Sequence, residues 1–244
     1  MSLEILNRHR RIWQEKKILQ RIYQNWYQLI LKECRPQGMT LEIGGGGGNF
    51  KKFFPEVISS DYTLCPWLDL NLDAHNLPFA ADSLANIVMI DVLHHLTRPL
   101  HFIEEAYRVL QEKGRLIMLE PCITPGSYLI YNFLHQEDLD FSKDLFKGET
   151  WISDDEKKPF DGNLAIPTQL FFRNAAAYKK KFSNFPIVQK KHSDYLVYPL
   201  SGGFDHPSVL PNSLVPFFIF LEKMLQPLGF MFAYRMLVVL EKNR

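Results

Sequence analysis

The sequence predicts an α/β fold built on a doubly wound, largely parallel sheet. Short apolar runs alternate with helical segments along the chain, and the first of these runs ends in five consecutive glycines. Such an alternation requires a sheet whose two faces are both covered. The expected strands are residues 39–43, 57–60, 68–72, 84–90 and 115–120, followed by 186–191 and 235–241.

The N-terminal segment has a helical pattern. Apolar residues recur at helical spacing over residues 5–31 with charged residues between them, which predicts one or two amphipathic helices. Pro36 and Gly38 end this segment. We interpret its basic residues as a solvated face. Further helices are expected over residues 49–54, 100–111, 168–182 and 213–225.

The composition indicates which kinds of binding partner and which cellular compartment are expected. The 28 basic and 27 acidic residues nearly cancel, so no nucleic-acid partner is expected. Cys34, Cys65 and Cys122 are odd in number and widely spaced, which favours a reducing, cytoplasmic setting over a disulfide framework or a metal site. The charged first twenty residues do not resemble a signal peptide. The apolar stretch 214–221 is too short to span a bilayer, although it leaves contact with a membrane surface open.

The glycine-rich loop is the most informative segment. A dinucleotide-binding GxGxxG pattern that starts at Gly44 or Gly45 would need glycine at position 49 or 50, where Asn49 and Phe50 stand instead. An ExGxGxG pattern is complete, and it consists of Glu42, Gly44, Gly46 and Gly48.

Further motifs follow the loop in a fixed order. Asp61 ends the next expected strand, where a carboxylate can accept hydrogen bonds from ribose hydroxyls. The later motifs are Asp73-Ala74 with the following Leu77-Pro78-Phe79, the run from Ile87 through Asp91 to His94-His95-Leu96, and the pair Arg108-Val109-Leu110 and Gly114-Arg115-Leu116.

Taken together, residues 38–121 resemble the class I S-adenosylmethionine (SAM) dependent methyltransferases of the methyltransferase type 11 domain family. The resemblance implies a Rossmann-like, seven-stranded sheet with an antiparallel last strand, and SAM as the cofactor with S-adenosylhomocysteine as its product. It also implies the cofactor contacts, which are Glu42, Gly44, Gly46 and Gly48 at the methionine part, Asp61 with Tyr62 at the ribose, Asp73 and Ala74 at the adenine, and Asp91 near the methionine end.

On this basis the chain is expected to be a single methyltransferase domain, 1–244. Residues 1–37 form its helical start and residues 38–121 its cofactor-binding core. The alternation of strands and helices stops over residues 123–167, which are rich in aromatic and turn-forming residues and contain no clear strand. We expect residues 122–167 and 195–232 to be lid or substrate insertions at the carboxyl ends of the strands.

SAM carries its own electrophile, so the protein mainly aligns a nucleophile and excludes water. His94 and His95 are the candidate bases for an acceptor that must lose a proton. They could equally be turn histidines that pack on the cofactor or cap a helix. The aromatic residues of the insertions favour a small-molecule or lipid-like acceptor with an oxygen, nitrogen or carbon nucleophile.

Two alternatives remain at this level. An NAD(P)-dependent oxidoreductase is disfavoured by the missing third glycine and by the lack of a Tyr-x-x-x-Lys pair in the middle of the chain. A methyltransferase-like module that binds SAM without catalysis cannot be separated from an enzyme by sequence, because methyl transfer needs no diagnostic catalytic residue.

Overall fold

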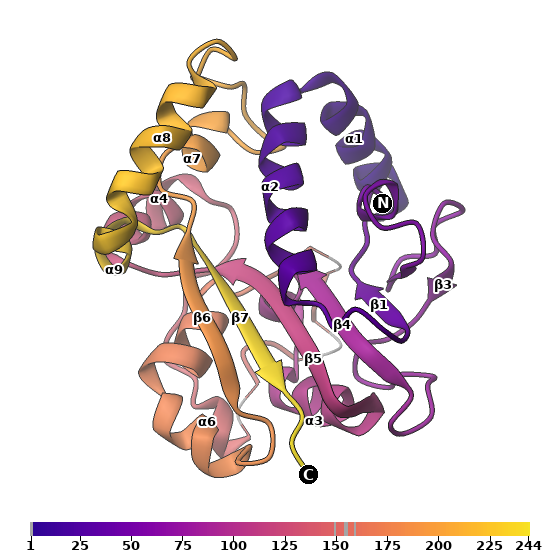
Figure 1. Cartoon of the computed structure of the whole chain (residues 1–244). Helices are drawn as coiled ribbons and strands as arrows, with labels where there is room; N and C mark the ends of the chain where they lie inside the picture. Colours follow the sequence, from indigo (N-terminus) through magenta and orange to yellow (C-terminus); the bar gives the residue numbers. More distant parts are fainter. Residues whose placement is uncertain (1, 149, 154–155, 159) are drawn as a thin grey trace.

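The computed structural model describes residues 2–148, 150–153, 156–158 and 160–244. Its centre is a seven-stranded sheet of order β3-β2-β1-β4-β5-β7-β6 (Figure 1). The strands are β1 (Thr40–Ile43), β2 (Ile58–Asp61), β3 (Leu70–Asn71), β4 (Leu84–Ile90), β5 (Leu110–Pro121), β6 (Ile187–Ser193) and β7 (Arg235–Glu241).

Strands β1 to β5 pair in parallel, and β7 lies antiparallel between β5 and β6. The central strand β4 is buried along almost its whole length, which explains its continuous apolar sequence. The fold class, including the antiparallel last strand, is confirmed.

Helices cover both faces of the sheet. On one face lie α1 (Ser2–Glu15) and α2 (Lys17–Glu33), and α2 buries Leu19, Trp26 and Ile30 in a core shared with β5 and β7. On the other face, α3 (Pro99–Val109) buries Phe102 and Ile103. The N-terminal segment is thus two helices, as its pattern allowed, with a break at Lys16.

The helix expected after the glycine loop is not formed. The chain makes only the 3-10 turn η1 (Phe50–Lys52). Pro55 disfavours helical backbone in the residue before it. The Phe50 ring is buried against Tyr27 of α2, with ring centroids 4.9 Å apart, so α2 covers the sheet at this place.

The segment 123–167 is less irregular than its sequence suggests. It contains α4 (Pro125–Leu134), which begins with a capping box between Thr124 and Ser127, and the turn η3 (Leu145–Lys147). The helix expected over residues 168–182 is also interrupted. A π-helical turn, η4 (Gln169–Arg173), separates α5 (Ala165–Thr168) from α6 (Ala175–Lys181).

The last helical region follows α7 (Val197–Ser201) and consists of α8 (Val215–Leu225), η5 (Gln226–Leu228) and α9 (Gly229–Phe232). These three form an 18-residue run, longer than the apolar stretch expected at 214–221, and only 11% of it is buried. By length and composition the run could cross a membrane, which by itself is a weak indication. Pro216 and Pro227 lie within it.

Candidate active site

The glycine loop follows β1 and is shaped by left-handed backbone. Gly44, Gly46 and Gly48 have φ of +71°, +47° and +69°, values that L side chains rarely adopt. At Gly44 the neighbouring chain also leaves no space, because a Cβ there would lie 2.2 Å from Val92 Cγ2. The alternate glycines of the ExGxGxG pattern are therefore required by the backbone itself.

Two carboxylates support this loop. Glu42 of β1 is buried, and its Oε2 has no hydrogen-bond partner within the described residues. Burial, with the nearby Asp61 and Asp69, raises the pKa of Glu42 to about 8. Asp61, at the end of β2, accepts hydrogen bonds from Gly46 N at 3.0 Å and Thr63 N at 2.8 Å. Asp61 therefore holds the glycine loop in place through the backbone of Gly46.

A pocket lies between this loop and the N-terminal helices. From the predicted set it is lined by Glu42, Gly44, Gly46 and Asp91. The side chains that sequence reasoning did not assign to it are Leu6 and His9 of α1, Tyr23 and Tyr27 of α2, Asn49, Ile90 and Phe204. The helical pattern of α1 and α2 gave no signal of this role, because it describes only which face is apolar.

The remaining predicted cofactor residues lie around the pocket. Gly48 packs on Trp67, whose Nε1 donates a hydrogen bond to Gly46 O at 2.7 Å. Tyr62 is 74% exposed. Asp73 accepts a hydrogen bond from His75 N at 2.8 Å, and Ala74 is buried in the core. Of the predicted cofactor residues, Gly48, Asp61, Tyr62, Asp73 and Ala74 are not among those that line the pocket.

Asp91 follows β4 and is held by a partner from the far end of the chain. Its backbone has φ +56°, and its carboxylate pairs with both Nη atoms of Arg235 on β7, with Nη2 2.8 Å from Oδ2. The buried Arg235 guanidinium lies over the rings of Trp26 and Tyr198, 4.3 Å from each centroid. Arg235 was not predicted from sequence.

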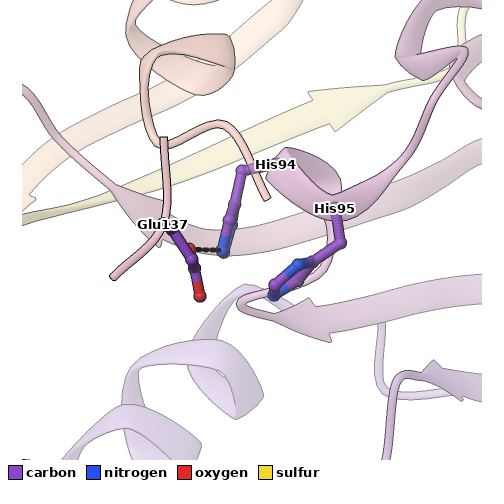
Figure 2. A group of neighbouring side chains, drawn as sticks. All are labelled: His94, His95 and Glu137. Carbon is purple, nitrogen blue, oxygen red and sulfur yellow. Dashed lines mark ion pairs between the residues drawn. The ribbon is translucent and has the colours of Figure 1, made fainter. Parts of the chain in front are cut away.

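His94 is enclosed between two carboxylates. Glu120, at the end of β5, accepts hydrogen bonds from the backbone of Val92 and Leu93 and lies 2.7 Å from His94 Nδ1. On the other side, Glu137 Oε2 lies 3.2 Å from His94 Nε2 (Figure 2). Burial disfavours a charge on His94, but Glu137 and Glu120 outweigh it and raise the pKa of His94 to about 10. The imidazolium is then poorly suited to accept a proton.

The pKa of His95 is shifted in the opposite direction from that of His94. Burial, together with the charge on His94, lowers the pKa of His95. Its Nδ1 lies 3.0 Å from the carbonyl oxygen of Asp161, so this nitrogen carries the proton and Nε2 carries the lone pair. Figure 2 shows His95 beside Glu137 and His94. Glu137 and Asp161 come from the insertion, where sequence gave no signal of their role.

The comparisons with known proteins agree with this geometry. Residues 41–118 match the model of a methyltransferase domain family, methyltransferase type 11. No curated protein sequence matches the chain significantly. Solved structures, by contrast, resemble it over nearly its whole length.

A SAM-dependent methyltransferase from Archaeoglobus fulgidus has a TM-score of 0.54 and 13% identity, over 91% of this chain and 94% of that one. A SAM-dependent methyltransferase from Thermotoga maritima has a TM-score of 0.51 and 16% identity, over all of both chains. Geranyl diphosphate C-methyltransferase from Streptomyces coelicolor has a TM-score of 0.52 and 11% identity, over 94% of this chain and 84% of that one.

At these identities the structural likeness is one of fold, and the domain match adds the type of enzyme. The predicted Rossmann-like fold and the resemblance over the glycine loop, β4 and β5 are confirmed together. Residues 41–118 therefore match a methyltransferase domain of the type 11 family, and the chain as a whole has the class I fold of the SAM-dependent methyltransferases.

Proposed function

We propose that this methyltransferase transfers the methyl group of SAM to an oxygen, nitrogen or carbon nucleophile of a small-molecule or lipid-like acceptor. The observation that supports the cofactor side best is the buried Glu42 Oε2 beside the glycine loop, which has no hydrogen-bond partner among the residues that the structure describes. A buried carboxylate without a partner is costly unless a ligand group satisfies it. The cationic amino group of SAM is such a group.

The other cofactor contacts are proposed from their places around the pocket. The glycine loop would face the methionine part, with Asp91 at its end. Asp61 has its two oxygens on Gly46 N and Thr63 N, and a carboxylate oxygen accepts more than one hydrogen bond, so it would still receive the ribose hydroxyls. Tyr62 would lie beside Asp61 at the ribose, and Asp73 and Ala74 would lie farther along, toward the adenine. SAM supplies the methyl electrophile, and these residues orient it.

The acceptor side is proposed from the insertions 122–167 and 195–232. Exposed apolar side chains gather on α4, α8 and α9, at the end of the sheet where β5 and β6 finish (Figure 1). The most exposed of them are Leu129, Phe133, Phe217, Phe220, Met224 and Phe230. Exposed apolar surface of this kind is typical of a site for an apolar ligand or a membrane surface. The similarly folded geranyl diphosphate C-methyltransferase binds an acceptor of this character.

The cofactor proposal is tested by calorimetric titration with S-adenosylhomocysteine and, separately, with NADH and NADPH. We expect saturable binding of the first alone. Asp61→Ala should weaken it about 5- to 150-fold, the equivalent of the ~1–3 kcal/mol lost with a buried hydrogen-bonding partner. Glu112→Ala, which removes an exposed carboxylate beside Arg244, is the control. Binding of a nicotinamide nucleotide only would contradict the proposal.

The acceptor proposal is tested with SAM that carries a labelled methyl group. The protein is incubated with cell extract, and the extract is then partitioned between water and an organic solvent. Label in small molecules of either phase supports methyl transfer, and label in the organic phase supports a lipid-like acceptor. Cofactor binding without any transferred label would favour a non-catalytic SAM-binding module.

A further inference from the structure

Three side chains beside the predicted active site direct donor atoms toward one point. They are His94 and His95, which end η2 (Leu93–His95) after β4, and Glu137, which follows α4. Their donor atoms all lie within 4.8 Å of one another. Figure 2 shows the two imidazoles and the carboxylate facing a common space. Two histidines and one carboxylate form a set of ligands used by zinc enzymes.

The remaining ring nitrogen of each histidine is already occupied. His94 Nδ1 lies 2.7 Å from Glu120 Oε2, and His95 Nδ1 lies 3.0 Å from the carbonyl oxygen of Asp161. Metal-binding histidines are typically oriented in this way, by a carboxylate or a backbone carbonyl that accepts the proton of the non-coordinating nitrogen. Both Nε2 atoms are therefore the ones left to bind a ligand.

The spacing between His94 and Glu137 is close to that of two ligands of one ion. Glu137 Oε2 lies 3.2 Å from His94 Nε2, yet this buried oxygen has no hydrogen-bond partner of good geometry within the described residues. Two atoms that each lie about 2.0–2.2 Å from one tetrahedral ion are roughly 3.3–3.6 Å apart. The observed separation of 3.2 Å lies just below this range, so a small shift of either side chain would let both atoms bind one ion.

The surrounding chain fixes this arrangement. A Cβ on Gly162 would lie 2.8 Å from His95 Nδ1, 2.9 Å from His94 Cδ2 and 3.0 Å from Glu137 Oε2. Only glycine lets the backbone pack so closely against all three side chains. The insertion is also tied to His94 itself, because Asn163 N donates a hydrogen bond to His94 O at 2.9 Å.

We propose that His94 Nε2, His95 Nε2 and the Glu137 carboxylate bind a divalent transition-metal ion of the zinc type. The ion would displace the proton that His94 Nε2 carries in the metal-free protein, and this proton would be released to solvent. Three protein ligands leave one position for water or for an oxygen or nitrogen of the acceptor, as in catalytic zinc sites. Imidazole ligands favour zinc and its neighbours over Mg²⁺, which prefers oxygen.

A second set of donor atoms nearby fits an ion less well. Asp91, His94 and Glu120 also lie within 4.8 Å of one another. However, Glu120 accepts two backbone hydrogen bonds besides His94, and Asp91 is held by Arg235. His94 belongs to both sets, and Asp91 of the second set lines the cofactor pocket. The proposed ion on His94 would therefore lie close to that pocket.

The test uses the full chain freed of metal with a chelator. Calorimetric titration with Zn²⁺ should show one ion per chain, and Co²⁺ should give the visible absorption bands of a tetrahedral site with nitrogen ligands. His95→Ala and Glu137→Gln should each weaken Zn²⁺ binding at least ~10–100-fold, and Glu120→Gln should weaken it by a similar factor through His94. His101→Ala is the control, because it removes a histidine that is 45% exposed and pairs with Glu104.

Binding of no ion, binding of Mg²⁺ only, or Zn²⁺ binding that is equal in the wild type, His95→Ala and Glu137→Gln would each overturn the proposal and leave a buried ion pair only. The Co²⁺ spectrum of the wild type decides the matter even where a variant fails to fold. Metal binding does not depend on methyl transfer, so titration with S-adenosylhomocysteine tests the two proposals separately.

Discussion

Glu42 shows how burial alone changes the chemistry of a side chain. Its pKa is raised to about 8 from an ordinary value of 4.5, because burial and the neighbouring Asp61 and Asp69 disfavour the carboxylate. The folded protein therefore keeps a proton that the unfolded chain releases between about pH 4.5 and 8. Glu42 thus favours folding fully below about pH 4.5, and this contribution is lost as the pH rises through about 8.

Cofactor affinity should follow the ionisation of Glu42. The cationic amino group of S-adenosylhomocysteine favours the carboxylate, so we expect affinity to rise by up to about tenfold per pH unit between about pH 6.5 and 8. Calorimetry in buffers of different ionisation enthalpy should show that binding releases a proton from the protein. In Glu42→Gln, both the pH dependence of the affinity and the proton release should disappear. An unchanged slope in this variant would show that another group is responsible.

Alanine substitutions at Gly44 and Gly148 can distinguish the cost of backbone strain from the cost of a steric clash. Both have left-handed backbone, with φ of +71° and +83°. A Cβ on Gly148 meets no atom of the described residues within 4 Å, whereas one on Gly44 meets Val92. Gly148→Ala should cost about 1–2 kcal/mol of stability. Gly44→Ala should cost about 1–3 kcal/mol more, and it should also weaken S-adenosylhomocysteine binding. Urea unfolding and calorimetry measure the two effects, and equal losses of stability would rule out the contact with Val92.

At the scale of elements, the pair Asp91–Arg235 joins the end of β4 to the start of β7. Arg235 is almost fully buried, with 3% of its side chain exposed, whereas 29% of the Asp91 side chain is exposed. Removal of Asp91 leaves a buried cation without its partner, and removal of Arg235 leaves an anion that water can reach. The two partners should therefore differ in their effect on stability.

We expect Asp91→Ala to destabilise the fold by about 3–5 kcal/mol, as for a broken buried ion pair. Arg235→Met should cost less, because methionine fills the space between Trp26 and Tyr198 and the Asp91 carboxylate that it leaves is 29% exposed. The double variant should resemble Arg235→Met, and chemical denaturation measures all three. A larger loss for Arg235→Met than for Asp91→Ala would show that stacking on the two aromatic rings outweighs the charge.

At the scale of the molecule, α1 and α2 lie over the glycine loop and line the pocket with it. They reach the loop directly, since Leu6 Cδ2 would lie 3.7 Å from a Cβ on Gly46 and Arg10 Cγ 3.3 Å from one on Gly47. The cofactor would thus contact α1 and α2, which precede the 38–121 core in sequence, and Phe204, which follows it. Its binding is expected to stabilise the whole fold.

The melting temperature should report this coupling. A ligand at 100 times its dissociation constant adds about 2.7 kcal/mol to the stability of the folded state. For a chain of this size, that corresponds to a rise of roughly 5–10 °C. S-adenosylhomocysteine should produce it in a thermal scan, and NADH at the same concentration should not. A similar rise with NADH would contradict the cofactor assignment.

The sequence by itself determined the strands, the order of the motifs and the left-handed glycine turns. These depend on neighbouring residues, on short continuous apolar runs, on helical periodicity and on the steric freedom of glycine, so they can be predicted without a structure. The absent helix after the loop is an exception, because Phe50 packs on α2 and tertiary packing overrode the local pattern.

Only the tertiary structure decided the electrostatics of the site. His94 meets Glu120 across 26 residues of sequence, and Asp91 meets Arg235 across 144. Such pairs carry no local pattern, and the protonation of each group depends on burial, which the sequence does not state. A histidine pair predicted as candidate bases thus became one enclosed imidazolium and one neutral imidazole, because the folded chain brings carboxylates to one and a carbonyl oxygen to the other.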